Sequence, residues 1–308
     1  MRRWLRRIGI AILALVVALT LASFAYNAAT SGDSKPAREL YPGPYVRVDG
    51  TALAYRRWGR GGPPIVLVGG FVEAAWVWHE LGPLLARGHR VYALDLPPFG
   101  YSERRGPYTL AHWLDLVRGF ESRLGIVRPL VVGHSLGAAV AVGLALRDPA
   151  AQRGIVLLDG DALSGGGGPG WLADLLVPPW YTSVYRIVTG SDWIFRRALK
   201  DAYGKRAPRL DAETLDEWQR PFQVAGTASA FKQMLGYGIQ GYRLADLRRV
   251  RGPRLVVWGT DDTVDDVSAG RRSARVLHAR FVLVPDAGHL SMLANPRAVA
   301  AAIDRFGS

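Results

Sequence analysis

The residues that could do chemistry begin with a serine between two glycines. Gly133-His134-Ser135-Leu136-Gly137 matches the pattern G-x-S-x-G and comes directly after the apolar run Leu130-Val131-Val132. A serine in this setting sits on a tight turn from a strand into a helix, where side chains in place of the glycines would collide with neighbouring backbone. The start of the following helix favours negative charge that develops beside the serine. We therefore predict that Ser135 is a nucleophile for acyl transfer.

Such a turn needs a sheet to hold it, and the sequence predicts one. Short apolar runs, typical of strands buried on both faces, alternate with helical patterns such as Leu110 to Leu124 and Leu136 to Leu146. The alternation predicts an α/β fold with a mostly parallel sheet covered by helices, and chemistry at the carboxyl ends of the strands. The predicted strands are Pro64–Val68, Val91–Asp95, Leu130–Val132, Ile155–Leu158, Leu255–Trp258 and Phe281–Val284.

One stretch breaks this alternation. Residues from Leu163 to Arg248 open on the glycine-rich run Gly165–Gly170, are rich in aromatic residues and show helical patterns without a convincing strand. We predict a helical cap at about 163–248, inserted over the strand ends. Its aromatic side chains either line an apolar acyl pocket or form the core of the cap itself.

Four segments together resemble the α/β-hydrolase superfamily, in its capped branch with a serine nucleophile. They are Pro64–Arg105, Gly133–Gly137, Trp258–Asp262 and Pro285–Pro296. The resemblance covers the chain from about residue 45 onward. It implies the α/β-hydrolase fold, with an eight-stranded, mostly parallel sheet, helices on both faces and a Ser-Asp-His triad in that chain order.

The resemblance also implies the partners of the serine. Serine is a poor nucleophile until a base takes its proton, and that base needs a third group to orient it. Pro285-Asp286-Ala287-Gly288-His289 resembles the family's catalytic histidine segment, which implies that His289 is the base. Trp258-Gly259-Thr260-Asp261-Asp262 resembles the family's strand ending in G-x-x-D, which implies that Asp262 is the acid. The alternative acids are Asp159, Asp161 and Asp261.

An acyl intermediate also needs two amide donors for its oxyanion. We expect one from the backbone of Leu136, the residue after the nucleophile, and the other from Phe71 in the loop Gly69–Val72. Most relatives have His-Gly where this chain has Gly69-Gly70. This departure leaves the Phe71 amide in place but raises the question of what holds the loop.

The first 44 residues predict a membrane signal and a tether. Met1 to Arg7 is basic, and Ile8 to Tyr26 carries no charge, close to the span of about 20 apolar residues that crosses a bilayer. We predict that residues 1–30 are a membrane anchor, or a signal peptide cleaved near Ser23-Phe24-Ala25. Residues 31–44 are then a tether, and 45–308 are the hydrolase domain. This order predicts a single-pass membrane protein with its catalytic domain outside the cytoplasm, or a secreted protein if the signal is cleaved.

Composition limits the other classes of function. The chain has no cysteine, so it has no disulfide framework and no thiolate metal site. Its net charge of +13 comes from arginines that either precede the apolar run or are scattered, which predicts no nucleic-acid partner. No metal cluster and no phosphate-binding glycine loop is found, so no cofactor is expected.

These features predict a serine hydrolase that cleaves an ester or related acyl bond in a small lipophilic substrate, through an acyl-enzyme intermediate. The alternatives are a cofactor-free haloperoxidase-like enzyme or carbon–carbon hydrolase, which resemble this sequence equally at the triad. A non-catalytic binding protein of the same fold is a further alternative.

Overall fold

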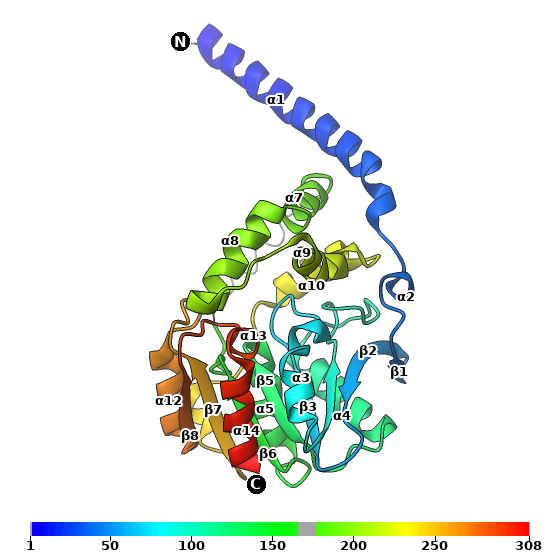
Figure 1. Ribbon diagram of the computed structural model, residues 1–308. Helices are drawn as coiled ribbons and strands as arrows, with labels where there is room; N and C mark the ends of the chain where they lie inside the picture. Colours follow the sequence, from blue (N-terminus) through cyan, green and yellow to red (C-terminus); the bar gives the residue numbers. More distant parts are fainter. Residues whose placement is uncertain (1, 166–176, 308) are drawn as a thin grey trace.

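A computed structural model of the chain describes residues 2–165 and 177–307. Its eight strands form one sheet in the order β1-β2-β4-β3-β5-β6-β7-β8 (Figure 1). β2 runs antiparallel to β1 and β4, and every other neighbouring pair is parallel. The predicted eight-stranded, mostly parallel sheet is confirmed. The strands are β1 Tyr45–Val48, β2 Thr51–Trp58, β3 Pro64–Val68, β4 Arg90–Leu94, β5 Leu130–His134, β6 Gly154–Leu158, β7 Arg254–Gly259 and β8 Arg280–Val284.

Helices cover both faces of the sheet, as predicted. On one face lie α4 (Leu110–Arg123), α5 (Leu136–Arg147) and α12 (Val267–Leu277), and on the other lie α3 (Leu81–Leu85) and α14 (Pro296–Gly307). Two separate buried clusters result, because alternate side chains of each central strand point to opposite faces. η2 (Ala75–Trp78) and α13 (Ser291–Ala294) complete this part of the chain.

The hairpin of β1 and β2 at the sheet edge was not among the strands predicted from apolar runs. β2 contains Arg56 and Arg57 and is only partly buried, so it lacks the continuous apolar pattern of the central strands. Its signal is the turn instead: Asp49 and Gly50 have φ of +44° and +81°. An Asp-Gly pair in this conformation is typical of a two-residue hairpin turn.

Helices between β6 and β7 lie over the carboxyl ends of the strands, between the sheet and α1 (Figure 1). We refer to their described residues, 177–247, as the cap; residues 166–176 of the predicted insertion, with most of its glycine run, lie outside the described residues. Tyr185, Phe222 and Phe231 pack against one another and form a core within the cap. The elements are α7 Trp180–Thr189, α8 Asp192–Tyr203, η3 Gly204–Arg206, α9 Ala212–Gln219, η4 Arg220–Gln223, α10 Thr227–Tyr237 and α11 Leu244–Leu247.

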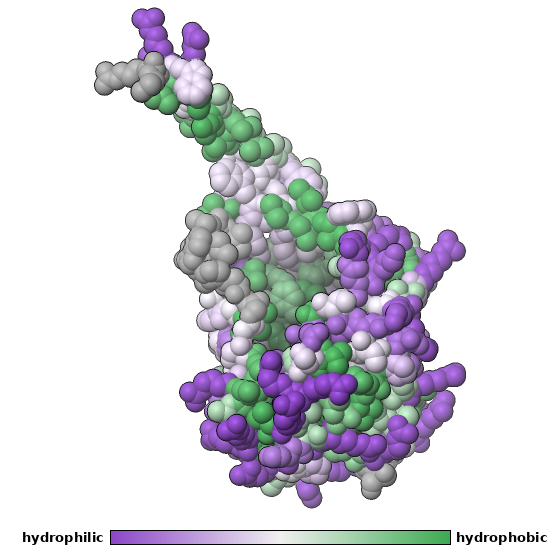
Figure 2. Space-filling view, turned by 90° about the vertical axis from the view of Figure 1, so that its left-hand side faces the viewer, coloured by the Kyte–Doolittle hydropathy of each residue, from purple (hydrophilic) through white to green (hydrophobic). Residues whose placement is uncertain are grey.

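The N-terminal segment forms one long helix, α1 (Arg2–Ala29), which extends away from the rest of the chain (Figure 1). By length and composition, its residues Arg3–Ala29 are long and apolar enough to cross a membrane. Figure 2 shows hydrophilic residues at its free end and apolar side chains along the part that follows.

The segment predicted as a tether has more structure than expected. It forms η1 (Ser31–Asp33) and α2 (Ala37–Leu40), and the backbone of Lys35 exchanges hydrogen bonds with Gln223 and Ala225 of the cap. The sequence predicted a tether, but a short bridge beside Val224 pairs both backbone groups of Lys35 with the cap.

Candidate active site

Ser135 occupies a strained turn between β5 and α5. Its φ of +50° and ψ of −119° are rare for a residue with a side chain, and its amide donates to Leu158 O at 3.0 Å. A Cβ at Gly133 would lie 2.1 Å from Gly137 O, and one at Gly137 would lie 2.4 Å from Val68 O. The glycines therefore allow the close backbone approach that holds the Ser135 side chain at the start of α5.

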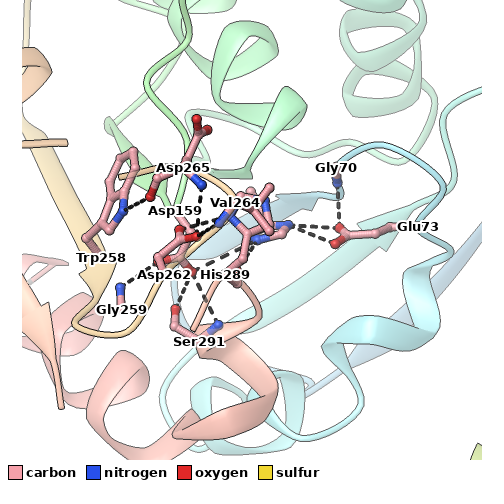
Figure 3. Close-up of polar contacts among 11 residues, drawn as sticks. Gly70, Glu73, Asp159, Trp258, Gly259, Asp262, Val264, Asp265, His289 and Ser291 are labelled. Atoms are coloured by element: carbon pink, nitrogen blue, oxygen red, sulfur yellow. Dashed lines mark hydrogen bonds and ion pairs between the residues drawn. The ribbon is translucent and has the colours of Figure 1, made fainter. Parts of the chain in front are cut away.

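His289 and Asp262 meet at the carboxyl ends of β8 and β7. His289 Nδ1 lies 2.9 Å from Asp262 Oδ2, and both side chains are buried (Figure 3). Asp262 Oδ1 accepts hydrogen bonds from the amides of Val264 and Asp265, each at 2.9 Å. These two donors fix the carboxylate, and the carboxylate in turn orients the imidazole with its Nδ1 protonated.

The alternative acids have other partners among the described residues. Asp261 pairs with Lys205 at 3.1 Å, and Asp161 accepts from the amide of Leu163 at 2.9 Å. Asp159 accepts from the Gly259 amide at 2.7 Å and from the Ser291 hydroxyl. Of the four candidate carboxylates, Asp262 is the one hydrogen-bonded to His289.

The serine and histidine segments come together through the residue before the serine. His134 Nε2 lies 2.7 Å from His289 O, and the two imidazole rings have centroids 5.0 Å apart. No hydrogen bond joins the Ser135 hydroxyl to the His289 imidazole in the described part of the chain. Catalytic contacts of this kind often shorten only when substrate is bound.

A cavity of about 450 Å³ joins the serine to both predicted oxyanion donors. Phe71, Ser135 and Leu136 line it together with residues of the cap and the strand ends: Ala139, Asp161, Ala162, Leu163, Ser164, Gly165, Ile239, Gln240, Val264 and Asp265. Within residues 2–165 and 177–307, the amides of Phe71 and Leu136 donate to no protein group. Two unpaired amides beside a serine are the arrangement that an oxyanion hole requires.

Glu73 and His134 were not predicted as site residues, yet they hold the loop Gly69–Val72, which contains the predicted donor Phe71. Glu73 Oε2 accepts from the Gly70 amide at 2.5 Å, and Glu73 Oε1 lies 2.9 Å from His134 Nδ1. Figure 3 shows Glu73 directed toward this pair of contacts from the loop after β3. The carboxylate therefore ties the loop to the serine turn, which answers the question raised by Gly69-Gly70. The available signal was an acidic residue within the otherwise apolar run Phe71–Trp78.

The surroundings of His134 favour the charged form of its buried imidazole. Burial by itself lowers the pKa of an imidazole, but Glu73, and more weakly Asp159 with Oδ2 at 4.0 Å, raise the pKa of His134 to about 9. Hydrogen bonding agrees, because Nε2 faces a carbonyl oxygen and Nδ1 faces a carboxyl group, an arrangement that favours a proton on both nitrogens. Burial also raises the pKa of Asp159 to about 7, an effect opposed by the nearby imidazoles.

No group of three or more His, Asp or Glu suited to a metal ion occurs among residues 2–165 and 177–307.

Comparison with known proteins places these features in a family. The sequence profile of the alpha/beta hydrolase family matches residues 65–302. The uncharacterized hydrolase YugF of Bacillus subtilis is 26% identical over 263 residues, which cover 84% of this chain and 95% of that protein. The chain is also 31% identical, over 261 residues, to the dihydrolipoyllysine-residue acetyltransferase component of the acetoin cleaving system of Cupriavidus necator. These residues cover 81% of this chain and 64% of that protein. A solved membrane phospholipase A, described as a bacterial virulence factor, superposes with a TM-score of 0.70 at 25% identity, over 99% of this chain and 98% of that one.

Proposed function

Since this chain belongs to the alpha/beta hydrolase family, we propose that it is a serine hydrolase which cleaves an ester or related acyl bond through an acyl-enzyme intermediate. In this proposal Ser135 is the nucleophile, His289 the general base and Asp262 the group that orients the base. The amides of Phe71 and Leu136 stabilise the oxyanion. The observation that carries the proposal is the 2.9 Å contact between Asp262 and the imidazole of His289, beside the strained turn of Ser135.

The chemistry follows the order of proton transfers that these groups permit. Ser135 Oγ attacks the carbonyl carbon while His289 Nε2 takes its proton, and the carbonyl oxygen becomes an anion between the two amides. Collapse of this tetrahedral intermediate breaks the bond to the leaving group, which receives the proton from His289. Water then attacks the acyl-serine with the same imidazole as base, and release of the acid restores Ser135.

A lipophilic acyl group fits the character of the cavity. Its wall includes Phe71, Leu136, Leu163, Ile239 and Val264, so an alkyl chain would be removed from water there. The similarity to a protein described as a membrane phospholipase A supports a substrate of this kind.

We further propose that α1 anchors the protein in a membrane, with residues 1–7 on the cytoplasmic side. Arginines before the apolar run and none directly after it favour this orientation. The alternative is cleavage after a residue near Ala25. Intact mass of protein recovered from membranes separates the two, because cleavage removes the whole apolar run.

The substrate proposal is tested with esters of increasing acyl length, using the full chain in detergent and its Ser135→Ala variant. We expect rates that increase from acetyl to longer acyl groups in the wild type and fall by at least ~10³-fold in the variant. No increase beyond acetate would contradict a lipophilic substrate. Equal rates in the variant would contradict the nucleophile, and cleavage of carbon–carbon substrates without any ester turnover would favour the carbon–carbon hydrolase.

A further inference from the structure

Helix α7 exposes an apolar stripe. Trp180, Val184, Ile187 and Val188 follow the spacing i, i+4, i+7 and i+8, which places them on one face of the helix. They are exposed by 41, 58, 54 and 41%. A surface helix ordinarily turns such a stripe toward the core.

One flank of α7 is already occupied, so the stripe is held outward. The Tyr181 hydroxyl donates to Ala228 O at 2.8 Å, and the Tyr185 hydroxyl donates to Phe222 O at 3.1 Å. The Tyr185 ring also packs against Phe222 and Phe231 in the core of the cap. A rotation that buried the stripe would break these contacts.

The side of α7 beside the stripe binds the end of α1. Ser23 Oγ lies 2.5 Å from Ser183 Oγ, and Asn27 Nδ2 donates to Pro179 O at 2.9 Å. Arg186 donates to Asn27 O at 2.6 Å. Figure 2 shows apolar side chains on the cap directly beneath the lower end of α1.

The length of α1 sets the depth of this contact in a bilayer. A hydrocarbon core of about 30 Å takes about 20 helical residues at 1.5 Å each, so a span that begins at Ile8 ends near Asn27. Ser23 then lies about 6 Å inside the far boundary. Because α7 is hydrogen-bonded to Ser23 and Asn27, the same bilayer reaches α7.

We propose that α7 is an interfacial helix which docks the cap onto the membrane leaflet where α1 emerges. Within the stripe, Val184, Ile187 and Val188 face the acyl chains of the phospholipids, and Trp180 lies at the level of the headgroups. Trp193, which is 75% exposed at the start of α8, also lies at the headgroup level. This inference depends on the proposed anchoring of α1. It places the cap, and with it the cavity at Ser135, against the surface in which a lipid substrate resides.

The depth of the stripe can be measured directly, because the chain has no cysteine. Single cysteines carrying a nitroxide are placed at Leu15 in α1, Val184 in the stripe and Val127, which is 72% exposed before β5 and serves as the matched control. The full chain is reconstituted in phosphatidylcholine–phosphatidylglycerol vesicles. Relaxation by oxygen, which concentrates in lipid, is compared with relaxation by a water-soluble nickel chelate.

We expect the labels at 15 and 184 to be relaxed preferentially by oxygen and the label at 127 by nickel. A label at 184 that behaves like the one at 127, while 15 remains in lipid, would overturn the docking of α7 alone. A label at 15 in water would overturn the anchor and the docking together. Broadening at 184 that disappears on dilution with unlabelled protein would show a second copy on the stripe, which also contradicts lipid contact.

A second measurement links docking to turnover. The double variant Val184→Asp/Ile187→Asp is compared with Val127→Asp on a water-soluble short ester and on a long-chain ester embedded in vesicles. We expect a loss of roughly tenfold on the vesicle substrate for the stripe variant alone, with unchanged rates on the soluble ester. Equal vesicle rates for the two variants would contradict the inference. Failure of the wild type on both esters would contradict the proposed hydrolase, whereas the nitroxide depths would still report on docking.

Discussion

Replacing Glu73 by glutamine removes the carboxylate that faces the buried imidazole of His134 while keeping the size of the side chain. Glu73 lies 2.9 Å from His134 Nδ1 and also accepts the Gly70 amide. The substitution therefore tests whether a buried imidazolium ties the loop Gly69–Val72 to the serine turn. We expect it to lower stability at neutral pH and to change how stability depends on pH.

The pKa of His134 gives the sign and the size of the effect. Since the folded pKa is raised from 6.5 to about 9, the stabilisation is complete below pH 6.5 and is lost as the pH rises through 9. Between pH 7 and 9.5, loss of the His134 proton lowers the free energy of unfolding by about 2 kcal/mol. This corresponds to a decrease of roughly 4–8 °C in Tm for a domain of this size. Without the Glu73 carboxylate the pKa of His134 falls toward that of a buried neutral imidazole, so we expect Glu73→Gln to lose less than half of that amount over the same range.

Thermal unfolding of the full chain in detergent, followed by circular dichroism from pH 6 to 10, measures this difference. The control is Asp201→Asn, which breaks an exposed ion pair with Arg197 and is expected to change stability by less than about 1 kcal/mol without altering the pH dependence. Glu121, whose pKa is raised to about 7 by burial and which does not interact with Glu73 or His134, titrates in both proteins and cancels in the comparison. An alkaline loss of Tm that is the same in wild type and Glu73→Gln would refute the buried imidazolium.

Three further substitutions test the site. Asp262→Asn is expected to lower kcat by ~10⁴-fold with an unchanged circular dichroism spectrum, because the imidazole of His289 loses the group that fixes its tautomer. A loss of kcat below tenfold would contradict the proposed role of Asp262. Gly70→Ala places a Cβ 2.9 Å from Ser135 Cβ and 3.2 Å from His134 Nδ1, so ester assays are expected to show a kcat lower by roughly 10²-fold; wild-type kcat would contradict the close approach of the loop. Phe71→Ala keeps the backbone donor but removes a ring packed on Phe99 and Phe231. We therefore expect KM for long-chain esters to increase roughly tenfold with kcat nearly unchanged. A selective loss of kcat would contradict the assignment of the ring to substrate binding and of the amide to catalysis.

The central strands could be predicted because they are buried on both faces. β3, β5 and β6 are buried throughout and each contains an unbroken apolar run, so the runs are visible in the sequence without any knowledge of their neighbours. The hairpin at Asp49-Gly50 required a turn signal rather than an apolar run. The contacts of residues 31–44 with the cap could not be predicted, because they depend on backbone groups that any residue carries.

At the site, the sequence predicted residue types but not the contacts that select among them. Four aspartates near the strand ends were candidates for the acid, and the separation between Asp262 and His289 is a property of the folded β7 and β8 ends. The roles of Glu73 and His134 depend on a contact between residues 61 positions apart. A contact between residues that follow two different strands leaves no periodic pattern in the sequence. It becomes visible only because β3 lies beside β5 in the folded sheet.

The most direct test of the proposed mechanism is the site and rate of labelling by a fluorophosphonate, which phosphonylates a serine activated by a neighbouring base. Peptide mass spectrometry of the labelled full chain should place the adduct on Ser135, and His289→Ala should slow its formation by at least ~10³-fold. An adduct on another residue, or undiminished labelling of Ser135 in His289→Ala, would contradict the activation of this hydroxyl by this imidazole.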